Sequence, residues 1–487
     1  MADVKAPDLH GRKAIYTSVS RVDGGNVVDV LGNAYVKHLV NRGQIEYLHR
    51  YYRGIQPVLD RVKEIRPEIC NKIVENRANA IVTFRVGYTV GKPIQYVSAV
   101  SDPKVSEQIA NLNDMLKVAG KATKDKELVE WQMICGTGYR LVLPSEKKRK
   151  KRVPFDVYTI DPRNAFVIYR NDVAHTPLAG VFYTTDDNGE VTFDVYTAGN
   201  EFFRVRGWQS GKIIESSTYA LSNIPIVEYP LNSARMGAFE VVLPLLDGLN
   251  DLNSNRLDSV AQNVQSLMLA YNCEFPDGTD ANTIRQAGMV VLKSIGENKA
   301  DMKIIGETLD QTQTETLRRS MLDAINEIVG IPGQGNGYTS DSSNTGAVIL
   351  KNGWQGAETR AQDFEVMFRD PEQRTIELLT EIANRLTNMD LDPDDIEVKF
   401  TRRNYEDLLS KSQTLVTMLG QDKIHPQCAY EASGLFVDTQ DAYNMGMEWY
   451  EKQKQEEQEA MEAEQKAQAD VGGTYIRGYY QKRSDRK

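Results

Sequence analysis

The sequence predicts an α+β fold in which sheet-rich and helical segments follow one another along the chain. Two patterns predict it: short strands separated by turn signals run from residue 136 to 230, and long amphipathic helices fill most of the second half. The chain has 487 residues, well beyond the ~250 to 300 at which a single hydrophobic core stops growing. We therefore expect two or more subdomains.

Composition places the chain among folded, water-soluble proteins. Hydrophobic residues make up 41% and charged residues 26%, which are ordinary proportions for a globular protein. No apolar run approaches the ~18 residues of a membrane span, and the N-terminus lacks the apolar core of a signal peptide. We expect a protein that acts in a cytoplasm without a membrane partner.

The net charge and the spacing of the cysteines argue against some classes of function. The formal net charge is -10, which argues against tight binding of nucleic acid, because such binding needs many Lys or Arg side chains to neutralise phosphates. A weak or transient contact is compatible with it. The four cysteines, Cys70, Cys135, Cys273 and Cys428, form no C-x-x-C pair, so we expect neither a zinc site nor a disulfide framework but small, buried apolar side chains.

The first part of the chain is predicted to be mainly helical. Residues 34–82 follow a helical pattern that a turn near Gly54 interrupts. At about Val82 the period changes to alternation, which predicts a strand up to Val90. Residues 104–135 return to a helical pattern.

Between residues 136 and 230 the sequence predicts a meandering antiparallel sheet. Its strands include "RLVLP", "FDVYTI", "AFVIYR", "GVFYTT", "VTFDVYTA" and "FFRVRGW". A basic run from Lys147 to Arg152 falls between the first two, where a hairpin tip is expected. We interpret it as a solvated tip, because like charges repel and stay exposed. The alternative is a nucleic-acid patch or a targeting signal.

Two long helical patterns bracket a small α/β segment. Residues 235–270 carry apolar side chains mostly at steps of three and four, and a second amphipathic helix runs from about 309 to 329. Asp310 and Gln313 give this second helix a capping-box-like start. Residues 271–306 between them are predicted to hold a short helix, "DANTIRQ", and two short strands, "GMVVLK" and "DMKIIG".

A very long helical pattern runs from about residue 345 to 386. Pro371 lies inside it, so we expect a kink or break near Arg369, because proline removes a backbone donor and clashes with the preceding turn. A short strand follows in "DIEVKF", and residues 404–468 are mainly helical. The tail from Val471 begins with two glycines and ends with basic residues, and is expected to be mobile.

The glycine-rich segment "GIPGQGNGYTSDSSNTG", residues 330–346, joins two of the helical patterns. A Walker loop needs a lysine and follows a strand, whereas this segment contains no Lys or Arg and follows a helix. It also lacks the glycine spacing of a dinucleotide fingerprint. We therefore expect no nucleotide site here.

No pattern brings catalytic or metal-binding residues together. The five histidines lack paired ligand spacing, and there is no nucleophile elbow. The cluster Asp390, Asp392, Asp394 and Asp395 lacks the Gly and Glu that an EF-hand requires, and is interpreted as an acidic turn. We predict no catalysis, no cofactor and no metal. Two alternatives stay open: a Mg-dependent enzyme acting on DNA through the glycine-rich loop and this cluster, and a scaffold using the Glu/Gln-rich helix near the C-terminus.

Six motifs add a family resemblance to this pattern. They are "YYRGIQPVL", "NRANAIVTFRVGYTVGKPIQY", "IDPRNAFVIY", "NIPIVEY", "SSNTGAVILK" and "DIEVKFTRRNYED". In order and spacing the chain closely resembles the SPP1-type portal proteins of tailed bacteriophages over most of its length. It departs from them at Thr83, where an acidic residue is expected, and in the basic run from Lys147 to Arg152.

The resemblance implies a ring of subunits, a dodecamer, at one capsid vertex, through which double-stranded DNA is packaged and ejected. The implied partners are further copies of the chain, DNA of any sequence, the terminase large subunit, the major capsid protein, a scaffolding protein and a head-completion or adaptor protein. The implied location is the virion, with host cytoplasm during assembly. The implied segments are a wing of helices and antiparallel sheet (1–234), stem helices (235–270 and 307–329), a clip (271–306), a tunnel loop (330–344), a long kinked wing helix with a strand (345–403), a helical crown (404–468) and a flexible tail (469–487).

The resemblance also points to the glycine-rich loop as the surface that faces DNA. Its candidate residues are Gly333, Gln334, Gly335, Asn336, Gly337, Tyr338, Thr339, Ser340 and Asn344. In "GQGNGYTSDSSN" only Asp341 is charged, so the polar side chains can make weak or water-bridged contacts to phosphate and sugar. Such a loop touches a duplex without holding it.

Overall fold

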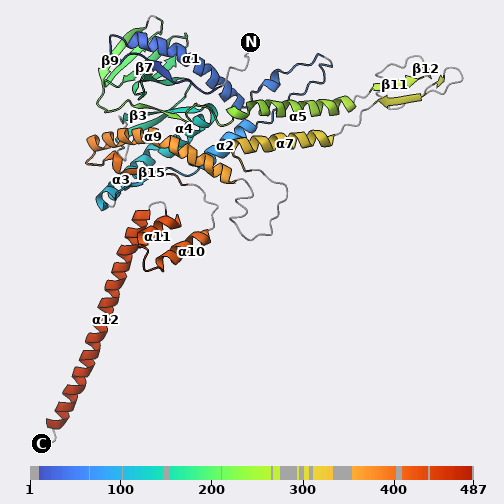
Figure 1. Cartoon of the computed structure of the whole chain (residues 1–487). Helices are drawn as coiled ribbons and strands as arrows, with labels where there is room; N and C mark the ends of the chain where they lie inside the picture. The colour runs from blue at the N-terminus through green and yellow to red at the C-terminus, as the bar shows by residue number, and fades with distance from the viewer. Residues whose placement is uncertain are drawn as a thin grey trace.

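The computed structural model shows a mixed fold of helices and sheets, so the expected α+β class is confirmed (Figure 1). The structure describes residues 10–64, 66–100, 102–145, 153–209, 211–264, 267–271, 273–274, 293–294, 301–305, 311–332, 354–401, 408–436 and 439–484. The basic run from Lys147 to Arg152 and the candidate loop residues lie outside them.

The N-terminal part is helical, as expected, but with different boundaries. Its elements are α1 (Val27–Tyr52), the 3-10 turn η1 (Pro57–Asp60), α2 (Arg77–Val90), α3 (Pro103–Ala119) and α4 (Lys121–Cys135). Residues 61–76 are not helical, so that part of the prediction is wrong. The predicted strand ending at Val90 is also wrong, because α2 continues through it. Val82, Val86 and Val90 are buried at steps of four, so the alternation coincided with a helical repeat.

Two sheets follow, and they confirm the predicted strands. The larger has the order β1-β5-β6-β7-β8-β9 and is antiparallel except for the β1–β5 pair. Its strands are β1 (Ile15–Thr17), β5 (Ala165–Arg170), β6 (Pro177–Thr185), β7 (Val191–Thr197), β8 (Glu201–Arg206) and β9 (Lys212–Thr218). Helix α1 covers one face, where Tyr35 packs edge-on against Tyr183 and Phe193.

The smaller sheet has the order β10-β3-β4 and lies beneath the first. Its strands are β3 (Thr137–Pro144), β4 (Phe155–Ile160) and β10 (Ile226–Pro230). Pro144 pairs with Phe155 in antiparallel register, so the basic run joins two paired strands, as a hairpin tip does. A two-stranded sheet pairs β2 (Gln95–Ser98) with β15 (Ile396–Lys399), which confirms the strand predicted in "DIEVKF".

Helix α9 (Trp354–Leu386) runs through the expected break at Pro371 as one helix. A break at this point is therefore wrong, whereas the kink that was expected as the alternative stays a prediction. Phe364 and Phe368 before the proline and Leu378 and Leu379 after it are all buried in the main hydrophobic core. Their burial stabilises both halves of the helix in the same core and offsets the ~3 kcal/mol cost of an internal proline.

Helices α5 (Leu243–Val264) and α7 (Gln311–Val329) lie side by side and project away from the sheets (Figure 1). Beyond their outer ends lie two antiparallel pairs, β11 (Leu267–Tyr271) with β14 (Asp301–Ile305) and β12 (Cys273–Glu274) with β13 (Lys293–Ser294). The first helix is shorter than the predicted 235–270, because its last residues form β11. The strand "DMKIIG" is confirmed by β14, whereas "DANTIRQ" and Asp310 lie outside the described residues.

The C-terminal part contains α10 (Leu408–Leu419), α11 (Pro426–Ser433) and α12 (Thr439–Ser484). Helix α12 extends away from the rest of the chain and passes through the two glycines at which a mobile tail was predicted to begin (Figure 1). The acidic turn is confirmed by the 3-10 turn η3 (Pro393–Asp395), where Asp392 accepts a hydrogen bond from the Asp394 amide at 3.0 Å. No helix in the described part of the chain is long and apolar enough to cross a bilayer.

The cysteines follow the prediction only in part. Cys135 is buried, and burial raises the pKa of its thiol to about 12. Cys70 is half-buried and Cys428 is exposed, so for these two the prediction of burial is wrong. Cys273 lies in β12, and the surroundings of its side chain are outside the described residues.

Candidate functional site

The predicted DNA-facing residues, Gly333 to Ser340 and Asn344, are outside the described residues, but both ends of their segment are described. Helix α7 ends at Gly330, which has a φ of +71°. The Gly330 amide donates to Glu327 O at 3.3 Å and the Ile331 amide to Asn326 O at 2.9 Å. This is a Schellman end, and the left-handed φ favours glycine there.

The other end of the segment, the start of α9, lies against this helix end. Arg360 donates from Nη2 to the Ile328 carbonyl at 3.1 Å, which satisfies one of the free carbonyls of the last α7 turn. A Cβ added to Gly330 would lie 3.1 Å from the Gly356 carbonyl and 2.9 Å from the Arg360 Cγ. The chain therefore leaves α7 and enters α9 at neighbouring points.

We call the end of α7 and the start of α9 the base of the loop. Helix α2 packs against this base. The rings of Phe84, Tyr88 and Trp354 lie within 5.8 to 6.1 Å of one another, centroid to centroid. The Tyr88 hydroxyl donates to Glu358 Oε2 at 2.9 Å. Three aromatic rings and a charge-assisted hydrogen bond thus hold the first turn of α9 on α2.

The base of the loop also carries two positive charges that sequence reasoning missed. Burial and the like charge of Arg360 lower the pKa of Arg85 to about 10, so Arg85 is still protonated at neutral pH. Asp363 acts in the opposite direction and favours the charged form. Because Arg85 lies more than 240 residues before the loop in the sequence, no local pattern signals its position there.

One half-buried carboxylate, Glu75, connects α5 and α7. Glu75 accepts hydrogen bonds from Asn253 of α5 at 2.7 Å and from Arg318 of α7 at 3.1 Å. Its own amide donates to Asn250 Oδ1 at 2.8 Å. Although partial burial acts to raise it, hydrogen bonds from Arg77, Asn253 and Arg318 hold the pKa of Glu75 below its usual value. The helix pair is therefore clamped by the segment that precedes α2.

A second carboxylate, Asp258 of α5, anchors residues 61–71 on the same helix. It accepts hydrogen bonds from the Asn71 amide at 2.7 Å and from the Asn71 side chain at 2.8 Å. It also pairs with Lys63 at 2.6 Å and Arg61 at 3.0 Å. Although desolvation acts to raise it, these contacts lower the pKa of Asp258 to about 2.

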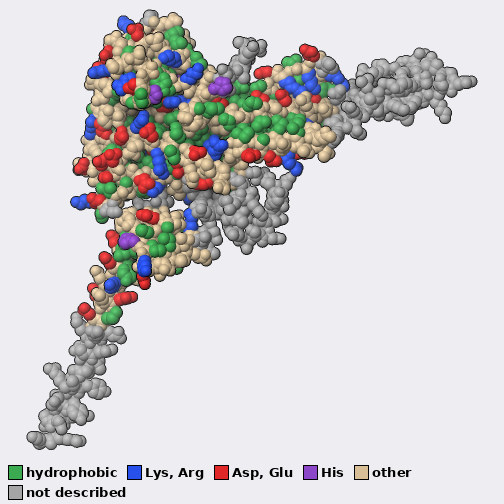
Figure 2. Space-filling view, viewed as in Figure 1, with side chains coloured by type: hydrophobic (Ala, Val, Ile, Leu, Met, Phe, Trp, Pro, Cys, Tyr) green, Lys and Arg blue, Asp and Glu red, His purple; other side chains and the backbone are tan. Residues whose placement is uncertain are grey.

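The α5–α7 pair exposes apolar side chains along its length (Figure 2). Leu257 and Val260 of α5 are 42% and 38% exposed, and Leu317 of α7 is 52% exposed. A shallow depression beside Leu257 and Val260 is lined further by Ile73 and Val74. An exposed apolar surface of this kind is typical of a face that another protein surface covers.

Four buried charged side chains form a network where α9 crosses β3 and β10. One of them belongs to α9 and three lie beneath it. Glu372 of α9 is fully buried and pairs with Lys121 at 2.8 Å and with Arg140 at 3.0 Å. Asp125, which also pairs with both cations, is the second anion. Tyr96 and Tyr229 donate to Glu372 at 2.6 and 2.8 Å. Although burial acts to raise it, Lys121 and Arg140 lower the pKa of Glu372 to about 2.

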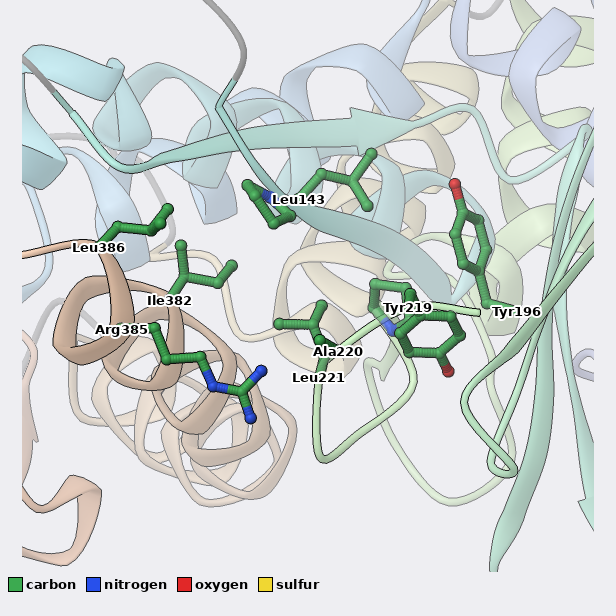
Figure 3. A pocket seen from close by; sticks show the side chains of 10 residues that line it. Leu143, Tyr196, Tyr219, Ala220, Leu221, Ile382, Arg385 and Leu386 are labelled. Atoms are coloured by element: carbon green, nitrogen blue, oxygen red, sulfur yellow. The ribbon is translucent and has the colours of Figure 1, made fainter. Parts of the chain in front are cut away.

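An apolar pocket of about 210 Å³ lies between the two sheets and the end of α9 (Figure 3). Leu143, Tyr219, Leu221 and Ile382 face its interior. Arg385 also lines the pocket, and its guanidinium pairs with Glu381 at 2.6 Å. The residues lining the pocket supply no acid–base pair. Nor does any part of the chain that the structure describes gather three His, Cys, Asp or Glu side chains as a metal would require.

Comparison with known proteins decides the family. A family model described as "Phage portal protein, SPP1 Gp6-like" matches residues 35–470. The chain belongs to this family. It is a phage portal protein, and the resemblance inferred from its motifs is confirmed. Portal proteins of this family are structural rather than enzymatic.

This portal protein is also similar to a solved structure titled "Neck of empty GTA particle computed with C6 symmetry", with 13% sequence identity and a TM-score of 0.42. The match covers 74% of this chain and 90% of that one. The comparison with curated proteins gave no significant match.

Proposed function

We propose that this portal protein forms a closed ring at one capsid vertex and conducts double-stranded DNA during packaging and ejection. The observation that carries the proposal is that the chain leaves α7 and enters α9 at neighbouring points. Arg360, Tyr88 and Trp354 anchor these points, and the sequence "GQGNGYTSDSSN" between them has a single charge. An anchored, nearly uncharged loop can follow a moving duplex without binding it strongly.

The segments take the roles that the family resemblance implies. Helices α5 and α7 are the stem, the β11–β14 region is the clip, the two sheets with α1 to α4 are the wing, and α10 to α12 are the crown. Residues 330–344 are the tunnel loop. The partners are the terminase, capsid, scaffolding and adaptor proteins, and the location is the portal vertex of the virion.

The ring is tested directly on the purified chain. Native mass spectrometry and negative-stain images are expected to give a closed ring of about twelve copies with a central opening. A chain that stays monomeric at high concentration and under crosslinking contradicts the proposal. Removal of residues 455–487 is expected to leave the ring intact, and loss of assembly would support the alternative of a helical scaffold.

The role of the loop needs a second test. Replacement of residues 333–340 by a Gly-Ser segment of equal length is expected to leave ring assembly unchanged and to lower DNA packaging or retention. A normal yield of infectious virions would exclude a role for the loop in the channel. DNA cleavage or ATP hydrolysis with Mg²⁺ that Asp392→Ala abolishes would instead support the enzyme alternative.

A further inference from the structure

The apolar pocket at the end of α9 has no part in the proposed function. Four parts of the chain bound it: the end of β3, strand β7, the segment between β9 and β10, and the last turn of α9 (Figure 3). Arg385 is the one charged residue among the ten that line it. The pocket is therefore an apolar space between elements that are far apart in the sequence.

The pocket has a buried floor and an exposed rim. Leu221 and Ile382 are 4% and 1% exposed, whereas Leu386 is 59% exposed. Ala220 is also exposed and stands next to Leu221 in Figure 3. A small molecule can therefore enter from solvent past Ala220 and Leu386 and reach buried apolar groups.

The polar groups around the pocket favour a ligand without charge. The Arg385 guanidinium is already paired with Glu381, and the Tyr219 hydroxyl donates to the Thr197 carbonyl at 2.6 Å. Burial raises the pKa of Tyr196 to about 12, so its hydroxyl keeps its proton at neutral pH. A charged ligand would lose its hydration without gaining an unpaired countercharge, which is costly.

The shape of the pocket favours a flat ligand. The rings of Tyr196 and Tyr219 have centroids 5.8 Å apart and an interplanar angle of 71°, so a flat ring stacked on one can meet the other edge-on. The volume of the pocket is about 210 Å³, whereas an apolar cavity of about 150 Å³ is sufficient to bind benzene. The pocket therefore has room for a ring system larger than benzene.

We propose that this pocket binds a neutral aromatic small molecule of about two fused rings. The site lies within one subunit and does not depend on the proposed ring or channel. Because the ligand touches the last turn of α9, β7 and the segment between β9 and β10 at once, it holds the end of α9 on the sheets. Pockets of this kind, apolar with few polar groups, are typical of small-molecule sites.

Binding is tested on the full-length chain by isothermal titration calorimetry, with 2-naphthol as the neutral two-ring compound. The expected Kd is about 0.01 to 1 mM, the range for a small apolar ligand of this size. 2-Naphthoate has the same rings with a carboxylate and is expected to bind about tenfold more weakly or worse, because a charge is costly to bury beside a guanidinium that is already paired. Hydrogen exchange locates the bound 2-naphthol, which should slow exchange in residues 219–225 and 382–386.

A substitution at the rim gives the matched comparison. Ala220→Phe fills the entrance and is expected to raise the Kd of 2-naphthol by about tenfold or more. Ala174→Phe is the control, because Ala174 is an exposed alanine in the β5–β6 turn and does not line the pocket. Its Kd should equal that of the wild type. Circular dichroism shows whether each variant is folded, and Leu386→Trp closes the same entrance from α9 if Ala220→Phe is not.

Four results would overturn the inference. The first is no heat of binding at the solubility limit of 2-naphthol. The second is tighter binding of 2-naphthoate, which makes the pocket an anion site around Arg385. The third is an equal Kd for wild type and the folded rim variant, which places the compound elsewhere. The fourth is binding to free subunits that disappears in assembled rings, which means that a neighbouring copy fills the pocket. None of these results bears on DNA conduction, so the proposed function stands or fails separately.

Discussion

Replacing Glu372 by glutamine is expected to destabilise the portal subunit strongly, although the two side chains have nearly the same shape. Glu372 is fully buried and lies between Lys121 and Arg140, which are 3% and 0% exposed. With a neutral amide in its place, these two cations share one anion, Asp125. The amide NH₂ would also point donors at groups that donate. Breaking a buried ion pair by removing one partner costs about 3 to 5 kcal/mol, a large part of the 5 to 15 kcal/mol that stabilises a typical domain.

The matched control is Asp370→Asn, the same chemical change two residues earlier on α9. Asp370 is 76% exposed at its side chain and pairs with Arg374 at 3.0 Å, one helical turn away. Exposed pairs of this kind contribute about 0.3 to 0.5 kcal/mol. Urea unfolding followed by circular dichroism measures both changes. If the two variants differ by less than about 1 kcal/mol, the buried charges do not stabilise α9 as reasoned here.

The same two variants also test how the stability of the subunit depends on pH. The pKa of Glu372 is lowered to about 2 in the fold, whereas an unfolded glutamate titrates near 4.3. Its contribution is therefore present above that value and is lost as the pH falls from about 4 toward 2. Glu372→Gln should flatten the loss of stability in this window, while Asp370→Asn should follow the wild-type curve. Parallel curves for all three proteins would refute the assignment.

Three further perturbations test the base of the loop and its supports. Gly330→Ala should destabilise the α7–α9 junction by about 1 kcal/mol or more, because Gly330 has a left-handed φ and a carbonyl lies close to the added Cβ. The control is Gly43→Ala in α1, where a Cβ meets nothing within 4 Å, and it should be neutral or stabilising. Hydrogen exchange at the start of α9 measures the effect of both substitutions. Tyr88→Ala should raise the same exchange and lower DNA packaging with rings intact, so normal packaging would exclude a role for the anchor. Asp258→Asn should lower unfolding stability mainly above pH 4, because its lowered pKa contributes stability there; equal losses at pH 2 and pH 7 would contradict this.

Local patterns predicted the elements whose signals were unambiguous. The strands from residue 137 to 230 are short, rich in β-branched and aromatic residues and separated by turn residues, so their pattern predicts strands without ambiguity. The segment from Val82 to Val90 failed because its valines satisfy both a period of two and a step of four. The proline in α9 misled the prediction because burial on both sides, which depends on residues far away in the chain, outweighs a local cost.

The sequence likewise pointed to only part of the candidate site. The family resemblance pointed to the glycine-rich loop as the surface that faces DNA, and this stays a prediction because Gly333 to Ser340 and Asn344 lie outside the described residues. Its anchors were not predictable, because Tyr88 and Glu75 reach the loop base and the helix pair across more than 150 residues of sequence. A local pattern carries no information about such pairings when a single sequence is considered.

The anchors also define how a force on the loop would be distributed. Helices α7 and α9 each have their own attachment: Glu75 joins α7 to α5, and Glu372 joins α9 to Arg140 of β3. In the proposed channel, a force on the loop therefore reaches the α5–α7 pair and β3 at once, while Tyr88 keeps the first turn of α9 in place. Because buried ion pairs and packed rings resist small displacements, these contacts make the junction of α7 and α9 rigid.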